Sequence, residues 1–390
     1  MDNAALVNLA PLARLVVLGS VIALGPLAWV WMRTRADGAA KRLQVLTLLT
    51  LFLTFDLVLF GAFTRLTDSG LGCPDWPGCY GSASPIGAQG EIDAAQRALP
   101  SGPVTQAKAW IEMLHRYLAT AVGVLITVLA LAHWRLHRRG ERAAASPGWA
   151  AATWVWVCIQ GAFGAFTVTL KLYPLVVSAH LLGGLALLAL LAVQADRARR
   201  RSVAVDAGLR RGLVTVAALA LMQIALGGWV STNYAVLACR DFPTCQGQWW
   251  PEALDFAQGF ALLRPLGVGQ GGGWLPFEAL TAIHLAHRVG AALLLAALLA
   301  LSWRLSSVVA LRRLAWGLVG VAAWQLATGI ANVVLDWPLA AAVGPTGGAA
   351  VLVLLLTALL GRTQGVARAG RAPRAAAPPA TPAVPMHGAP

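Results

Sequence analysis

The chain has 390 residues, of which 58% are hydrophobic and only 12% are charged. Its mean hydropathy of +0.67 excludes an ordinary water-soluble protein and predicts an integral membrane protein in contact with the lipid bilayer. The formal net charge is +14. The basic residues gather in short connections between apolar stretches, so this charge reflects membrane topology and predicts no nucleic-acid partner.

Nine apolar stretches are long enough to cross a bilayer, which takes about 20 residues in a helix. The first is expected to be a retained span and not a signal peptide, because the basic cluster from Arg33 to Arg42 follows it. The stretches cover roughly residues 15–32, 43–62, 111–132, 149–170, 174–194, 213–232, 279–301, 313–335 and 339–360.

The connections between spans are alternately rich and poor in Lys and Arg along the chain. The rich connections are 33–42, 135–142, 197–211, 304–313 and the tail after 362, and the poor ones are 63–110, 171–173, 233–278 and 336–338. The positive-inside rule then predicts an extracytoplasmic N-terminus and a cytoplasmic C-terminus. The tail is rich in Ala, Pro and Gly, which predicts disorder.

The segment from Gly61 to Gly81 has a degraded copy 166 residues later, from Gly227 to Gly247. The copies share glycine, cysteine, aspartate and proline in register, whereas Arg65 becomes Ser231. This tandem duplication predicts an all-α integral membrane protein of two tandem four-helix bundles plus one extra N-terminal transmembrane helix. The predicted parts are the extra helix with its basic loop (1–42), the N-terminal half (43–195), a basic linker (196–212), the C-terminal half (213–361) and the tail (362–390).

Each copy carries two cysteines six residues apart, Cys73 with Cys79 and Cys239 with Cys245. Both pairs fall in loops predicted to be extracytoplasmic, where disulfides form and persist. A four-thiolate metal site is the competing hypothesis. It is disfavoured because the spacing exceeds that of the usual zinc motifs and the pairs belong to different repeats.

Ionisable residues inside membrane spans are costly and therefore indicate function. Glu112 and His115 are three residues apart, so they share one helical face, and His284 and His287 stand at the corresponding place in the second repeat. His180 lies in a later span of the first repeat, at a depth similar to that of His115. The first repeat therefore has a histidine pair beside a carboxylate.

Two histidines at one depth in an apolar bundle, with Gly164, Gly183 and Gly184 nearby, suit axial ligation of a haem. The alternative is that each histidine only hydrogen-bonds a neighbouring helix. Three arginines near the outer interface also admit two interpretations, bidentate contact with haem propionates or snorkelling to lipid headgroups. These are Arg65, Arg116 and Arg288.

The run from Thr64 to Pro77, together with Glu112-x-x-His115-Arg116, His180-Leu-Leu-Gly-Gly and His287-Arg288, resembles the haem A synthase family. The resemblance covers residues 43–360. It implies an oxidoreductase of cytochrome oxidase assembly in a bacterial-type inner membrane, which oxidises the C8 methyl group of haem O to a formyl group.

The resemblance also assigns roles to residues and partners. It implies that His115 and His180 ligate the substrate haem, that Glu112 is the acid or base beside the reacting methyl group, and that His287 ligates a haem b in the C-terminal half. It suggests a haem O synthase as partner, leaves the electron donor unidentified, and leaves a homo-oligomer possible.

The sequence departs from the family where a fourth histidine is expected. Gly344 or Pro345 stands there, and neither can bind iron. The second haem would then be five-coordinate on His287, ligated differently, or absent. The alternative function is a dihaem b-type electron-transfer protein without haem-modifying activity, which would need two intact ligand pairs.

Overall fold

The computed structural model describes residues 10–141, 146–197, 202–269 and 272–366. Within these ranges nine helices are long and apolar enough to cross a membrane. They match the nine predicted spans one for one and confirm an all-α, multi-pass membrane protein. They are α1 (Ala10–Arg33), α2 (Ala39–Leu66), α4 (Gln106–Arg138), α5 (Pro147–Thr169), α6 (Pro174–Arg197), α7 (Ala207–Thr232), α9 (Phe277–Ser306), α10 (Arg312–Val334) and α11 (Leu339–Arg362).

Prolines and capping side chains set several helix starts. Pro147 and Pro174 begin α5 and α6, where a missing N–H costs nothing because no helical carbonyl precedes it. The side chain of Thr105 accepts a hydrogen bond from the Lys108 N–H at 3.3 Å and caps α4. Such caps satisfy backbone groups that have no partner inside the helix.

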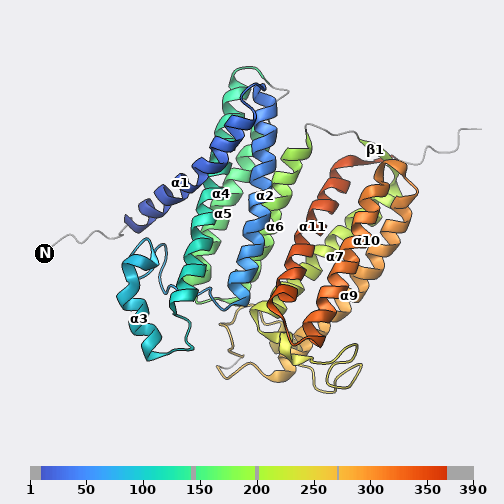
Figure 1. The fold of residues 1–390 in the computed structure, drawn as a ribbon. Coiled ribbons are helices and arrows are strands. Elements are labelled where there is room, and N and C mark those ends of the chain that lie inside the picture. Colours follow the sequence, from blue (N-terminus) through green and yellow to red (C-terminus); the bar gives the residue numbers. More distant parts are fainter. Residues whose placement is uncertain (1–9, 142–145, 198–201, 270–271, 367–390) are drawn as a thin grey trace, which may run out of the picture.

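The helices form two bundles that stand side by side (Figure 1). The first bundle contains α2, α4, α5 and α6, and the second contains α7, α9, α10 and α11. Helix α11 contacts both α2 and α6, so it lies at the junction. Helix α1 packs on α4, where Gly19 permits close approach, since a Cβ there would lie 2.5 Å from Cγ2 of Thr120.

The shorter elements were not predicted from the sequence. Helix α3 (Gln89–Ala98) lies in the first cysteine loop, and the single turn α8 (Phe256–Gly259) lies in the second. Strand β1 (Val203–Asp206) pairs in parallel with β2 (Thr363–Val366), which joins the linker before α7 to the residues after α11. The rest of the predicted disordered tail, 367–390, lies outside the described residues.

Both cysteine loops lie at the same end of the molecule, and the β1–β2 pair lies at the other (Figure 1). We name the end that carries the cysteine loops the cysteine-loop end. An even number of helices in each half brings the two copies into the same orientation. Each half packs around its own apolar cluster, and a further cluster lies between the halves.

Candidate haem site

His115 on α4 and His180 on α6 are close enough to interact electrostatically. Each imidazole faces a glycine of a neighbouring helix. A Cβ on Gly61 would lie 3.1 Å from Cε1 of His115, and one on Gly164 would lie 3.5 Å from Cε1 of His180. The ring of Phe60 stacks on His115 with 6.0 Å between centroids. A larger residue at Gly61 would therefore press on the His115 ring, whereas a Cβ at Gly164 would make an ordinary contact with His180.

The Nδ1 atoms of His115 and His180 are buried and have no hydrogen-bond partner among the described residues. Both side chains are only partly buried as a whole. Unpaired nitrogens on two imidazoles from different helices form a donor set that suits the axial ligation of haem iron. The residues of the first half therefore fit a haem.

Glu112 is buried one helical turn from His115, with 4% of its surface exposed. Its Oε2 accepts a hydrogen bond from the backbone N–H of Cys73 at 2.8 Å, and its Oε1 accepts one from Arg116. The Arg116 guanidinium also donates to three carbonyls of the first cysteine loop. These belong to Asp75, Pro77 and Gly78, at 3.0, 3.2 and 2.6 Å. The loop thus fixes the carboxylate in place.

A disulfide between Cys73 and Cys79 closes a short turn within this loop. The Asp75 carboxylate accepts hydrogen bonds from the N–H groups of Tyr80 and Gly81 at 2.6 and 2.7 Å. The second loop repeats the arrangement with the disulfide Cys239–Cys245 and with Asp241, which accepts from Gln246 and Gly247 at 2.7 and 2.9 Å. Thr244 and these backbone groups lower the pKa of Asp241. Both predicted disulfides are present.

His287 on α9 repeats the contact of His115. A Cβ on Gly227 would lie 3.1 Å from its Cε1, the distance found between Gly61 and His115. Unlike its counterpart, its Nδ1 has a partner, because the amide nitrogen of Gln223 lies 2.9 Å away and also donates to the His287 carbonyl at 3.0 Å. The environment of the second-half histidine is therefore more constrained.

His284 occupies the place that Glu112 has in the first half, and it also holds its loop. Its Nδ1 lies 3.0 Å from the carbonyl oxygen of Ala235, so the ring N–H donates to that oxygen. Arg288 donates to the carbonyls of Thr244 and Cys239 at 2.6 and 3.1 Å. The second half has kept this scaffold for its loop while replacing the carboxylate.

The register of α11 identifies the residue at the fourth-ligand position. Two glutamines each lie against a glycine of the next helix: Gln160 against Gly183, and Gln325 against Gly348. Both members of these contacts recur at a spacing of 165 residues. Adding 165 to 180 gives 345, so Pro345, and not Gly344, stands opposite His180 in the repeat.

Pro345 lies inside α11 and has no N–H for the carbonyl of Ala341 four residues earlier. The side chain of Asn332 on α10 donates to that carbonyl at 3.2 Å. A Cβ on Gly329 would meet no atom within 4 Å, although its counterpart Gly164 faces an imidazole. The helix is thus adapted to the proline, and space remains where the first half has His180.

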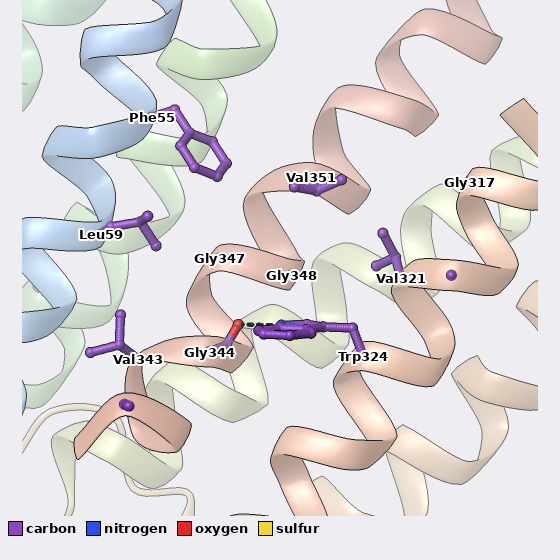
Figure 2. Close-up of a pocket in the computed structure, with 12 residues that line it drawn as sticks. Phe55, Leu59, Gly317, Val321, Trp324, Val343, Gly344, Gly347, Gly348 and Val351 are labelled. Carbon is purple, nitrogen blue, oxygen red and sulfur yellow. Dashed lines mark hydrogen bonds between the residues drawn. The ribbon is translucent and has the colours of Figure 1, made fainter. Parts of the chain in front are cut away.

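A cavity of about 540 Å³ lies beside this region, between α2 and the glycine-rich faces of α10 and α11 (Figure 2). Trp324 borders it and donates from Nε1 to the Gly344 carbonyl at 3.0 Å (Figure 2). The described residues that line it carry no titratable side chain. This cavity is therefore separate from the histidine sites.

The three arginines expected near haem propionates all donate to protein groups at the cysteine-loop end. Arg65 donates to Asp68 at 3.2 Å and to the Ser231 carbonyl at 2.7 Å, in addition to the contacts of Arg116 and Arg288 given above. Contact with propionates stays a prediction.

Three polar residues inside spans were not singled out from the sequence, although a polar group in a span itself indicates function. They are Gln223, Asn332 and the exposed Asp56 of α2.

Duplicated four-helix membrane bundles with a half-buried histidine pair beside a buried carboxylate define a class of haem-handling membrane proteins. Within that class, a family model described as cytochrome oxidase assembly protein, COX15-CtaA, matches residues 44–357, and the chain belongs to this family.

Curated relatives agree with this assignment. "Heme A synthase" of Shewanella oneidensis is 40% identical over 317 residues, which cover 80% of this chain and 93% of that protein. The protein of the same name from Alkalihalophilus pseudofirmus is 28% identical, with 71% and 81% covered. The one from Symbiobacterium thermophilum is 29% identical, with 74% and 85% covered. The function of the chain is haem A synthesis.

Proposed function

We propose that the protein oxidises the C8 methyl group of haem O to a formyl group and that its N-terminal half holds the substrate. One observation carries this proposal. Among the described residues, the first half has two imidazoles with unpaired Nδ1 atoms and a buried carboxylate one turn from one of them. The second half has a single comparable histidine, His287.

Each residue of the first half has a role that follows from its contacts. His115 and His180 would hold the iron of the substrate, and Gly61 and Gly164 leave room beside their rings. Conversion of a methyl to a formyl group releases protons, and the Glu112 carboxylate is placed to accept one. The Cys73 N–H and Arg116 hold this carboxylate in a single orientation.

In the second half we place a haem b with one protein ligand, His287. When bound, this haem supplies a redox-active iron for electron transfer. The residues fit it incompletely, because Pro345 stands at the second ligand position. The Gln223 contact at Nδ1 of His287 is compatible with ligation, since the other ring nitrogen would bind the iron. A haem O synthase would supply the substrate, and the cysteine loops would lie on the extracytoplasmic side of a bacterial-type inner membrane.

A dihaem b-type electron-transfer protein is the alternative function. It would need two complete ligand pairs, and Pro345 at the fourth position disfavours it. Purification followed by pigment extraction and chromatography distinguishes the two functions. We expect haem A or a hydroxylated haem in the extract, whereas haem b alone would support the electron-transfer protein.

Variants of the histidines test the assignment of the halves. His115→Ala and His180→Ala should each remove the substrate pigment and spare the pigment of the second half. His287→Ala is the matched control, and it should remove the pigment of the second half and spare the substrate pigment. If His115→Ala empties only the second half, the two halves have been assigned the wrong way round.

A further inference from the structure

Two hydrogen bonds at the cysteine-loop end join residues that are equivalent in the repeat. Arg65 Nη2 donates to the Ser231 carbonyl at 2.7 Å, and the Tyr234 hydroxyl donates to Asp68 Oδ1 at 2.7 Å. Both pairs are 166 residues apart, which is the repeat spacing. A residue that contacts its own equivalent lies on the axis that relates the two copies.

The same axis passes through the apolar cluster between the halves. This cluster contains three further equivalent pairs, Val58 with Ile224, Leu185 with Ala350 and Leu188 with Val353. At the opposite end, Arg362 donates to the Asp196 carboxylate at 2.8 and 3.3 Å, one residue beyond the register of α6 and α11. The axis therefore runs along the helices from one end to the other, as in parallel repeats.

The groups that meet on the axis at the cysteine-loop end are unlike. The first half contributes a cation and an anion, Arg65 and Asp68, which also pair with each other at 3.2 Å. The second half contributes a carbonyl and an aromatic ring, and the Arg65 guanidinium lies 4.2 Å from the centroid of Tyr234. The Arg65 side chain is only 15% exposed. The arrangement buries a charged group between the halves.

A pairing of two like halves would lose this complementarity. Two first halves would place Asp68 against a second Asp68, with no ring beside Arg65, and like charges in contact are destabilising. Two second halves would bring two tyrosines together with no carboxylate to accept their hydroxyl groups. In the cluster below, the large Leu185 is matched by the small Ala350, whereas two leucines would crowd the axis.

We propose that Arg65, Asp68, Ser231 and Tyr234 form a clasp that is complementary only between unlike halves. The surface of the first half thus fits the second half and rejects another copy of itself. The clasp also sets the spacing of the candidate haem sites, because Gly61 and Gly227, which face His115 and His287, each lie one turn before it.

Exchange of the clasp residues across the axis tests this proposal on the full-length protein. Because the axis makes the two positions equivalent, the fourfold exchange of Arg65→Ser, Asp68→Tyr, Ser231→Arg and Tyr234→Asp should rebuild the clasp in the opposite sense. The double variant Arg65→Ser, Asp68→Tyr and the double variant Ser231→Arg, Tyr234→Asp should each lower the thermal unfolding midpoint by about 3 °C, and the fourfold variant should recover it. A fourfold variant no more stable than the two double variants would overturn the proposal.

A matched control uses equivalent residues of the loops that the clasp does not include. Trp76 and Phe242 are also 166 residues apart. The effects of Trp76→Phe and Phe242→Trp on the midpoint should simply add. If the double variant Trp76→Phe, Phe242→Trp recovered its unfolding midpoint as fully as the fourfold clasp variant does, the recovery would not depend on contact across the axis.

Cross-linking tests which halves pair. The Asp196→Cys, Arg362→Cys variant, oxidised in membranes, should form a link within one chain and migrate as a monomer without reductant. Asp196→Cys alone should give no cross-linked dimer. A dimer from this single variant would mean that first halves meet each other at the axis, and it would refute the selectivity of the clasp.

Discussion

The ion pair between Glu112 and Arg116 determines how substitutions at the carboxylate should be read. Both residues are buried, with 4% and 8% of their surfaces exposed. Loss of one partner leaves the other charge buried, which costs about 3 kcal/mol. An alanine variant therefore mixes a structural effect with a chemical one.

Glu112→Gln separates these effects. The amide retains the size of the side chain and an acceptor oxygen, but it cannot accept a proton at neutral pH. We expect the pigment content to stay near that of the unaltered protein and haem A formation to fall by about 100-fold or more. Pigment chromatography and the thermal unfolding midpoint provide the two readouts. Substantial haem A from this variant would rule out Glu112 as the proton acceptor.

Pro345 gives a second prediction at the residue scale. If the second half binds haem b through His287 alone, its iron has an open position, so it should show a high-spin spectrum and bind carbon monoxide. Pro345→His should convert this haem to a low-spin centre with two histidine ligands. Two low-spin bis-histidine haems in the unaltered protein would reveal a ligand that the structure does not identify.

At the scale of elements, α10 and α11 form a matched pair around this proline. A proline inside a helix removes one backbone hydrogen bond, and within a membrane no water replaces it. Asn332 provides the replacement from the neighbouring helix. The two residues therefore act as one unit, although 13 positions separate them in the sequence.

A double-mutant cycle tests this unit. Asn332→Leu should lower the stability by about 1–3 kcal/mol, because the Ala341 carbonyl loses its donor. In a Pro345→Ala background the backbone N–H returns to that carbonyl, so the same substitution should cost much less. Thermal unfolding midpoints of the four proteins measure the difference. An equal cost in both backgrounds would contradict compensation by Asn332.

The nine membrane-spanning helices of the described ranges and both disulfides could be predicted from the sequence, since bilayer thickness fixes span length and the cysteines recur with the repeat. The partners of Arg116 could not be predicted. Its three carbonyl acceptors depend on how the first cysteine loop folds back onto α4. The role of Asn332 likewise depends on helix adjacency, which hydropathy does not encode. The repeat spacing shows that Arg65 and Ser231 are equivalent residues of the two copies. Only the packing of the helices shows that these two residues contact each other.

At the scale of the whole molecule, the cysteine loops gather at one end and the basic connections at the other. The positive-inside rule predicts that the cysteine-loop end faces away from the cytoplasm. Ser101 lies exposed at that end, between α3 and α4, and Ser307 lies exposed after α9 at the opposite end.

Single substitutions at these serines test the orientation in intact cells. A membrane-impermeant thiol reagent should label Ser101→Cys without permeabilisation and should label Ser307→Cys only after it. The unaltered protein controls for labelling of its own cysteines. The reverse pattern would invert the topology and place the disulfides in a reducing compartment.

The axis along the helices has a consequence for energy coupling. It places the glycine–histidine contacts of the two halves at equal depth, so an electron passed between them travels parallel to the membrane plane. A charge that crosses the whole membrane exchanges about 2.3 kcal/mol with a potential of 100 mV, and one that moves at constant depth exchanges none. If both halves hold haem as proposed, the transmembrane voltage would neither drive nor oppose electron exchange between them, and the reduction potentials of the two sites alone would set its direction.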